Sequence, residues 1–383
     1  MNPVFANLPT TIFDVMSGLA RTHGAINLGQ GFPEHQGPAD IKAAAAEAMV
    51  NGVNQYPPMR GLPALREGVA AHYARAQGLP LTADNVVVTS GGTEAIASAV
   101  LGLVAPGDEV VLFEPAYDAY LPLVKLAGAT ARIVRLEPPL WRITEAALEA
   151  AITPRTRLVM FNNPHNPTGR LFDAEEVAIL ARACVAHDLV AVCDDVWEHV
   201  RFDGAAYRPL IAEPGMAERT VKIGSAGKIF SMTGWKVGWA VAAASLIGPV
   251  AGAHQFLTFT TAPALQTGVA FGLSKPDAWF DAMRADYQRS RDRLAAALAA
   301  QGYAVLPSQA TYFICVDLAA SGVNLDDEAF CRQAVTEAGV AAIPVSAFYH
   351  EAPVRSVVRL CFAKNDDTLD QGAERLGRFR RGQ

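Results

Sequence analysis

A serine and two lysines lie close together among glycines in the middle of the chain. The stretch Ile223–Trp239 reads IGSAGKIFSMTGWKVGW and holds Ser225, Lys228 and Lys236. A lysine that follows a buried strand can lose its proton through desolvation and react with a carbonyl as a Schiff base. The neighbouring hydroxyl and second lysine are suited to an anion. The stretch therefore indicates amine chemistry beside an anion site.

Two known motifs offer other interpretations of these residues. Ser225-Ala-Gly-Lys228 matches the S-x-x-K pattern of serine-nucleophile penicillin-binding enzymes, but the companion tripeptides S-D-N and K-T-G are absent from the sequence. The phosphate-binding pattern G-x-x-x-x-G-K-[ST] is absent as well. The simple alternative is that Lys228 is a surface lysine in a loop. The buried strand that precedes Lys228 argues against this interpretation.

Further polar groups follow apolar segments elsewhere. Asp194, in CDDVWE, either caps a helix or pairs with a protonated ring nitrogen, and no histidine or glutamate spacing completes a metal site around it. SGGTEA, at Ser90–Ala95, opens a helix whose backbone amides would bind phosphate, unless it is only a tight connection. In NNPHNPTG, prolines fix Asn162 and Asn166 as neutral donors or simply form a turn, in which we expect a structural role for His165.

Arg359 lies in the apolar segment SVVRLCF. A buried guanidinium needs an anionic partner, which is either a substrate carboxylate bound in bidentate fashion or an internal carboxylate. The sequence leaves both open.

Short apolar strands alternate with turns and helical stretches. The expected strands are Val86–Thr89, Glu109–Phe113, Leu158–Phe161, Leu189–Asp195 and Val221–Ser225, with a helix at Asp173–His187. Such a pattern predicts an α/β fold with a mostly parallel sheet covered on both faces. Ligands bind beyond the carboxyl ends of such strands, which is where the polar motifs fall.

From about Asp281 the pattern changes to a long charged helix followed by other strands. These strands are expected at Thr311–Asp317, Val340–Pro344 and Val357–Phe362. We therefore predict an N-terminal arm joined to a small domain at 1–45, a large domain at 46–280 and a small α+β domain at 281–383.

Composition limits the class of protein. The 383 residues are 51% hydrophobic and 18% charged, with a net charge of -6, which indicates a globular enzyme and argues against a nucleic-acid binder. Five cysteines show no C-x-x-C pair, the N-terminus has no secretory pattern, and the apolar run Ala240–Ile247 is too short to span a membrane. We expect a cytoplasmic protein that uses neither nucleic acid nor membrane.

Together these motifs resemble those of the fold-type I pyridoxal-phosphate aminotransferases, along essentially the whole chain. The motifs are NLGQGFP, NQYPPMRG, VTSGGTEA, EPAYDAY, NNPHNPTG, SAGKIFSMTGWKVGW, HQFLTFTTAP, ATYFICVD, VAAIPVSAFY and VRLCFAK. They are most similar to the methionine and kynurenine aminotransferase group, which includes glutamine transaminase K. The resemblance implies the aspartate-aminotransferase-like fold, with a mostly parallel seven-stranded sheet and a smaller α+β domain.

The resemblance also implies roles for individual residues. Lys228 would bind pyridoxal 5'-phosphate covalently and then shuttle a proton, and Asp194 would hold its pyridinium. The other cofactor-binding residues would be Gly92, Thr93, Tyr117, Asn162, Asn166, Trp197, Ser225, Lys236 and, from the partner subunit of a homodimer with shared sites, the residue equivalent to Tyr56. The substrate carboxylate would be bound by Arg359, Asn166 and Gly31, with Phe13 and Phe348 as walls of the side-chain pocket.

One residue departs from the family. Trp197 stands where the family usually has a tyrosine, and an indole N–H can donate a hydrogen bond but neither accept one nor ionise. Either it keeps the donor contact or the indole is turned away.

The activity implied is transfer of an amino group from an apolar, sulfur-containing or aromatic L-amino acid, of methionine, kynurenine or glutamine type, to a 2-oxo acid by a ping-pong mechanism. A carbon–sulfur β-lyase on the same fold, of cysteine-conjugate or cystathionine type, is the alternative. A ligand-sensing regulator is a remote one, because NLGQGFP begins within the first thirty residues and leaves no room for a preceding DNA-binding module.

Overall fold

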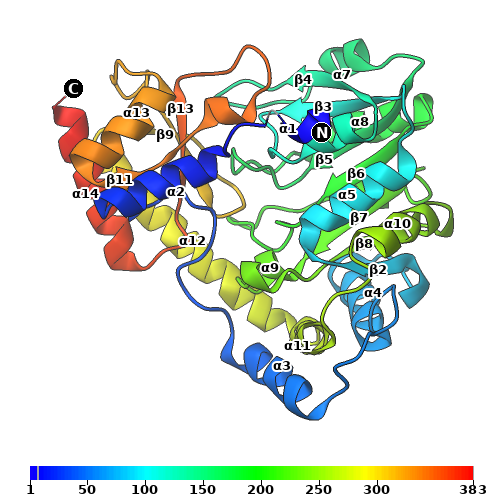
Figure 1. The fold of residues 1–383 in the computed structure, drawn as a ribbon. Helices are drawn as coiled ribbons and strands as arrows, with labels where there is room; N and C mark the ends of the chain where they lie inside the picture. Colours follow the sequence, from blue (N-terminus) through cyan, green and yellow to red (C-terminus); the bar gives the residue numbers. More distant parts are fainter. Residues whose placement is uncertain (7, 383) are drawn as a thin grey trace.

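The computed structural model, which describes residues 1–6 and 8–382, has a seven-stranded sheet at its centre (Figure 1). In spatial order its strands are β2 (Val86–Thr89), β8 (Gly238–Val241), β7 (Thr220–Ser225), β6 (Val190–Asp194), β5 (Thr156–Asn162), β3 (Glu109–Glu114) and β4 (Thr130–Arg135). Only β8 runs against its neighbours; the other strands are parallel. The predicted α/β fold with a mostly parallel sheet is confirmed.

Helices cover both faces of this sheet. Strand residues alternate between the faces, so Val110 and Leu112 pack with helices α5 (Gly91–Leu103) and α10 (Ala244–Leu257), while Val111 packs with α8 (Ala174–Ala186). The start of α8 is fixed by a capping box between Asp173 and Glu176. Burial on both faces explains the near-continuous apolar character of the strands.

A second, smaller sheet lies at the C-terminal end of the chain. It is antiparallel, with strands β12 (Ile343–Pro344), β13 (Val357–Cys361), β10 (Phe313–Asp317) and β9 (Ala304–Val305) in that order. Its accompanying helices are α12 (Asp277–Ala300), α13 (Asp327–Gln333) and α14 (Asp366–Arg381). The predicted boundary at residue 280 falls within the first turn of α12.

The N-terminal segment lies against this second sheet region. Strand β1 (Ile26–Asn27) pairs in parallel with β11 (Val340–Ala341), and helix α2 (Ile12–His23) lies beside the C-terminal elements in Figure 1. Residues from both ends of the chain can therefore meet above the large sheet.

The remaining elements complete the layers. They are α1 (Pro3–Ala6), α3 (Ala39–Asn51), α4 (Pro63–Gln77), α6 (Tyr120–Leu126), α7 (Glu145–Ala151), α9 (Ala226–Ile229), α11 (Pro263–Leu273), four short 3₁₀ turns (Ala83–Asn85, Leu210–Ala212, Thr233–Trp235, Val345–Phe348) and a π turn (Ala334–Ala338). No helix in the described part of the chain is both long and apolar enough to cross a membrane.

The expected strands are present with small shifts at their ends. The strand expected at Val340–Pro344 is two strands, because Val340–Ala341 pairs with β1 whereas Ile343–Pro344 pairs with β13. Strands β4 and β8 were not expected from the sequence.

Candidate active site

A cavity of about 180 Å³ opens at the carboxyl ends of the central strands. It is lined by fourteen residues, which are Gly91, Gly92, Thr93, Ile96, Tyr117, Asn166, Asp194, Val196, Trp197, Ser225, Gly227, Lys228, Thr233 and Lys236. Nine of the eleven residues expected to bind the cofactor are in this set; Asn162 and Tyr56 are not. The strand ends thus converge as parallel topology requires.

Lys228 projects into this cavity from the short helix α9, which follows β7. Its Nζ donates a hydrogen bond to the Tyr312 hydroxyl (3.3 Å) and lies 4.6 Å from the centre of the Trp197 ring. Burial lowers the pKa of Lys228 to about 8, although the negative charge of Asp194 opposes the shift. A substantial neutral fraction at physiological pH makes this amine a nucleophile and a base.

Asp194 ends β6 and faces the same cavity. Its Oδ2 accepts a hydrogen bond from the Tyr120 hydroxyl (2.6 Å) and its Oδ1 one from the Val196 amide (3.4 Å). Burial raises the pKa of Asp194, while these hydrogen bonds and the charge of Lys228 favour the carboxylate. A cationic ring nitrogen beside it would stabilise the ionised form further.

The lining of the cavity also carries donors for an anion. Gly91 to Thr93 form the first turn of α5, where amide groups point outward without intrahelical partners. Gly91 has φ of +81°, and a Cβ there would lie 3.0 Å from Lys236 Nζ, so only glycine lets the lysine approach the helix. With Ser225 these groups suit a phosphate.

Two asparagines connect the carboxylate end to the substrate side. Asn162 lies outside the cavity, where its amide donates to the Asp194 carbonyl (2.7 Å) and its Oδ1 accepts from the Asn166 backbone (2.8 Å). The Asn166 Oδ1 accepts from Arg359 (2.8 Å), which leaves its amide hydrogens directed elsewhere. Asn166 is therefore oriented as a donor toward the cavity that it lines.

Arg359 on β13 is a buried cation, 1% exposed, and in the described residues no carboxylate forms an ion pair with it. Its second terminal nitrogen donates to the Gly29 carbonyl (3.1 Å), and no group in the described ranges accepts a hydrogen bond from Nε. Burial lowers the pKa of Arg359 only to about 10, so the group stays charged at neutral pH. Its unsatisfied donor and its charge suit a carboxylate ligand.

Aromatic rings surround this guanidinium. Phe313 lies 3.9 Å from it, and Phe13 and Phe348 each lie 5.2 Å away. Phe13 and Phe348 meet edge to face at 5.7 Å. Gly31 stands nearby, where a Cβ would come within 2.8 Å of the Phe313 ring. The expected substrate residues are thus gathered in one place.

Tyr56 is not part of this site within one chain. Its side chain is 83% exposed and contacts Phe259, with ring centres 5.5 Å apart. His165 is buried and bonded to Thr168 (2.8 Å), and burial lowers its pKa to about 3, so it is a neutral structural group in the turn.

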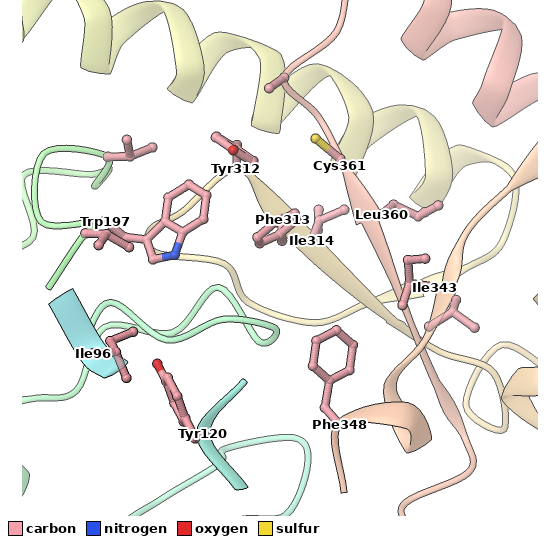
Figure 2. Close-up of a cluster of buried hydrophobic side chains, with 14 of the residues drawn as sticks. Ile96, Tyr120, Trp197, Tyr312, Phe313, Ile314, Ile343, Phe348, Leu360 and Cys361 are labelled. Atoms are coloured by element: carbon pink, nitrogen blue, oxygen red, sulfur yellow. The ribbon is translucent and has the colours of Figure 1, made fainter. Parts of the chain in front are cut away.

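Tyr120 and Tyr312 are polar groups of the site to which the sequence argument gave no role. Figure 2 shows Tyr312 beside Trp197, and Tyr120 near Ile96. Tyr120 is the last residue of the EPAYDAY motif, but nothing local in that motif indicates that its hydroxyl reaches Asp194. Nothing local in ATYF indicates that Tyr312 reaches Lys228.

Pyridoxal phosphate fits the residues that line the cavity. The lining combines a carboxylate suited to the pyridine nitrogen, an anion cradle of helix amides and Lys236, and the amine of Lys228. Fold and cavity together define a pyridoxal-phosphate-dependent enzyme.

Comparisons with known proteins identify the family. The model of "Aminotransferase class I and II" matches residues 23–376. The probable N-succinyldiaminopimelate aminotransferase of Mycobacterium tuberculosis is 46% identical over 96% of this chain and 95% of its own, and the solved structure of the N-succinyldiaminopimelate aminotransferase from that organism superposes with a TM-score of 0.95. The methionine aminotransferase of Escherichia coli is 40% identical over 96% of each chain. The human kynurenine–oxoglutarate transaminase 1 is 32% identical over 94% of each.

The chain belongs to the class I and II aminotransferases and has the aspartate-aminotransferase-like fold. It is a pyridoxal-phosphate-dependent transaminase, which uses an amino acid and an oxo acid as substrates.

Proposed function

We propose that this aminotransferase takes its amino group from L-amino acids with an apolar, sulfur-containing or aromatic side chain and passes it to a 2-oxo acid. The observation that carries the proposal is the ring pair of Phe13 and Phe348 beside Arg359. With the α-carboxylate on Arg359, Gly31 and Asn166, a donor side chain would extend along these apolar faces.

In this proposal the cofactor lies between Asp194 and the first turn of α5. Thr93, Ser225 and Lys236 join the Gly92 amide at the phosphate. Tyr117 would cover a ring face, Trp197 would line the pocket as a donor, and Asn166, supported by Asn162, would donate to the phenolic oxygen. These contacts would hold the cofactor beside Lys228.

Lys228 is the proposed proton carrier. The chemistry supplied by bound pyridoxal phosphate is to accept the amino group and delocalise the electron pair left when the α-proton departs. Arg359 holds the substrate so that the α-hydrogen faces Nζ, and the neutral amine of Lys228 takes that proton and later returns it. Asp194 keeps a positive charge at the ring nitrogen by staying ionised.

A second candidate donor carries a distal carboxylate, as in N-succinyldiaminopimelate. The 46% identical relative with that printed activity favours it. Two carboxylates argue against it. The negative charge of Asp118 raises the pKa of Arg359 and so opposes the lowering by burial. The negative charge of Asp14 in turn raises the pKa of Asp118, so both carboxylates lie near this guanidinium. A second anionic group of a substrate would be repelled there.

A donor screen separates these candidates. Single-turnover loss of the cofactor's aldehyde absorbance would be measured with methionine, phenylalanine, kynurenine, glutamine, aspartate and N-succinyldiaminopimelate. We expect the first three to react fastest, and Phe348→Ala to slow them selectively because an apolar wall is removed. If N-succinyldiaminopimelate reacts fastest, the apolar-donor proposal is wrong. Release of pyruvate and ammonia from cystathionine would instead support the β-lyase alternative.

We propose further that the enzyme is a homodimer with shared sites. Apolar side chains that are strongly exposed in one chain gather in two segments around Tyr56 and Phe259, namely Met49, Val50, Val53 and Tyr56, and Phe256, Leu257 and Phe259. A monomer rarely leaves so many exposed together. In the dimer, Tyr56 would reach the phosphate of the neighbouring site.

Mixing inactive variants tests the shared site. Lys228→Ala and Tyr56→Ala chains would be purified, mixed, partly denatured and refolded together. With shared sites, each hybrid dimer regains one intact site, so activity rises above that of either variant alone. If the mixture stays at the sum of the two parents, Tyr56 does not act across the interface.

A further inference from the structure

The amine of Lys228 has an unusual set of neighbours. One side faces the indole ring of Trp197, whose centre is 4.6 Å from Nζ and which offers a π face but no lone pair. Within residues 1–6 and 8–382, its one hydrogen-bond partner is the Tyr312 hydroxyl at 3.3 Å. The orientation of the amine thus depends on a single oxygen.

The direction of this hydrogen bond is fixed by a second one. The Tyr312 hydroxyl donates its only proton to the Gly31 carbonyl at 2.8 Å. A phenol has one donor, so toward Lys228 the Tyr312 oxygen acts as the acceptor. An acceptor stabilises the protonated amine more than the neutral amine.

The Tyr312 ring has little freedom to move. It is fully buried and meets the Trp197 ring edge to face at 4.3 Å, with the Phe313 ring at 5.0 Å (Figure 2). The ring of Tyr287 lies 6.1 Å away. Trp197 therefore has two functions, since one surface faces the amine and the ring also holds Tyr312 in place.

We propose that Tyr312 is a positioning residue that holds the Lys228 amine by accepting its hydrogen bond and links this amine to the Gly31 backbone. The inference rests on the proposed role of Lys228. The Gly29–Gly31 segment also contacts Arg359, through the Gly29 carbonyl at 3.1 Å. Tyr312 thus joins the group that binds the substrate carboxylate to the group that moves the proton.

Other charges near Lys228 are independent of Tyr312. Burial lowers the pKa of Lys228, the negative charge of Asp194 raises it, and the positive charges of Arg359 and Lys236 lower it. These groups stay in place when the Tyr312 hydroxyl is removed. Its loss should therefore move the titration of Lys228 in one direction, toward lower pH.

The test measures the amine itself in the full-length chain after removal of the cofactor. Competitive acetylation at pH 6 to 11, followed by peptide mass analysis, gives the titration midpoint of Lys228. We expect Tyr312→Phe to lower the midpoint by about one pH unit, the value of one lost hydrogen bond to a charged group. Tyr287→Phe is the matched control, because its hydroxyl bonds Ser231 instead, and it should leave the midpoint unchanged.

The outcomes are distinct. An unchanged midpoint in folded Tyr312→Phe, or an equal shift in Tyr287→Phe, overturns the inference. If Tyr312→Phe does not fold, 3-fluorotyrosine at position 312 keeps the shape and weakens the acceptor, and a smaller shift of the same sign is required. Failure of the proposed Lys228 role would show differently, because borohydride reduction of the wild-type holoenzyme would then leave no cofactor on the Lys228 peptide.

Discussion

Lys222 on β7 is fully buried and lies between two buried carboxylates. Its Nζ bonds Asp195 (2.7 Å), Glu198 (2.6 Å) and the Tyr207 hydroxyl (3.1 Å). Burial alone would lower the pKa of Lys222, but the two carboxylates raise it above its usual value. The lysine is therefore a fixed positive charge in a buried ion group, and it is not among the residues that line the cavity.

Replacing Lys222 by methionine keeps the length of the side chain and removes its charge. The carboxylates of Asp195 and Glu198, each 2% exposed, then lose the cation that balances their charge. Removing one partner of a buried pair typically costs about 3–5 kcal/mol of unfolding free energy. The triple variant Lys222→Met, Asp195→Asn, Glu198→Gln should recover most of that loss, because no charge stays buried.

The loss should depend on pH with a defined sign. Burial raises the pKa of Asp195 to about 6, whereas the charge of Lys222 outweighs burial at Glu198 and keeps the pKa of that carboxyl below its usual value. Without Lys222, burial should raise the folded pKa values of both carboxyls above their unfolded values. A raised folded pKa means that the folded state holds protons the unfolded state has lost, so stability falls as pH rises, by up to about 1.4 kcal/mol per pH unit for each group. The deficit of Lys222→Met should be small near pH 5 and largest near pH 8.

Urea titrations followed by circular dichroism at pH 5, 6.5 and 8 measure this deficit. Arg182→Met breaks an exposed pair with Glu175 and serves as the control, with an expected change below about 1 kcal/mol at each pH. A deficit for Lys222→Met that is under 1 kcal/mol at pH 8, or that shrinks as pH rises, would refute the assignment of a buried ion group.

Three further outcomes follow from the site. Lys228→Ala should abolish turnover and the borohydride-fixed cofactor adduct, and normal transamination by this variant would reject the proposed role. Arg359→Lys should lower kcat/KM for an amino acid about 100-fold, through loss of bidentate carboxylate binding, but should barely affect the corresponding amine without a carboxylate; equal losses for both would contradict carboxylate binding. His254 is bonded to Glu94 (3.0 Å), which raises its pKa despite burial, so its contribution to stability is present below its unfolded pKa and lost as pH rises through the folded value. The stability advantage of wild type over His254→Gln should therefore narrow between pH 6 and 9 in urea titrations, and a constant advantage would contradict an ionised pair.

Much of the architecture could be predicted because it depends on local sequence patterns. Apolar runs such as Leu158–Phe161 and Val221–Ser225 identify strands buried on both faces, and their order with helices implies parallel pairing, as found for β5 and β7 with β6. Parallel strands bring their carboxyl ends to one edge, so Asp194, Ser225 and the α5 turn had to converge. The strand at Gly238–Val241 was missed because glycine and tryptophan after a polar turn carry no such pattern.

Contacts between segments that are far apart in the sequence could not be predicted in this way. Tyr120 reaches Asp194 across 74 positions, and Tyr312 reaches Lys228 across 84. Tyr120 begins α6 and Asp194 ends β6, so their contact depends on how this helix packs beside the large sheet, whereas Tyr312 directly precedes β10 of the second sheet. Local periodicity encodes neither arrangement. The role of Tyr56 could not be read from local patterns either, since its proposed binding site lies in another copy of the chain.

The contrast between Lys222 and Lys228 explains why one segment provides both a structural and a reactive amine. Both are buried and lie six positions apart. Lys222 faces two carboxylates at hydrogen-bond distance, so its proton is held more tightly than in water. Lys228 faces an indole, a phenol and the more distant Asp194, which compensate burial only in part, and its pKa falls to about 8. Burial alone therefore does not identify a catalytic lysine; the lack of a bonded carboxylate does, because only that amine can give up its proton near neutral pH.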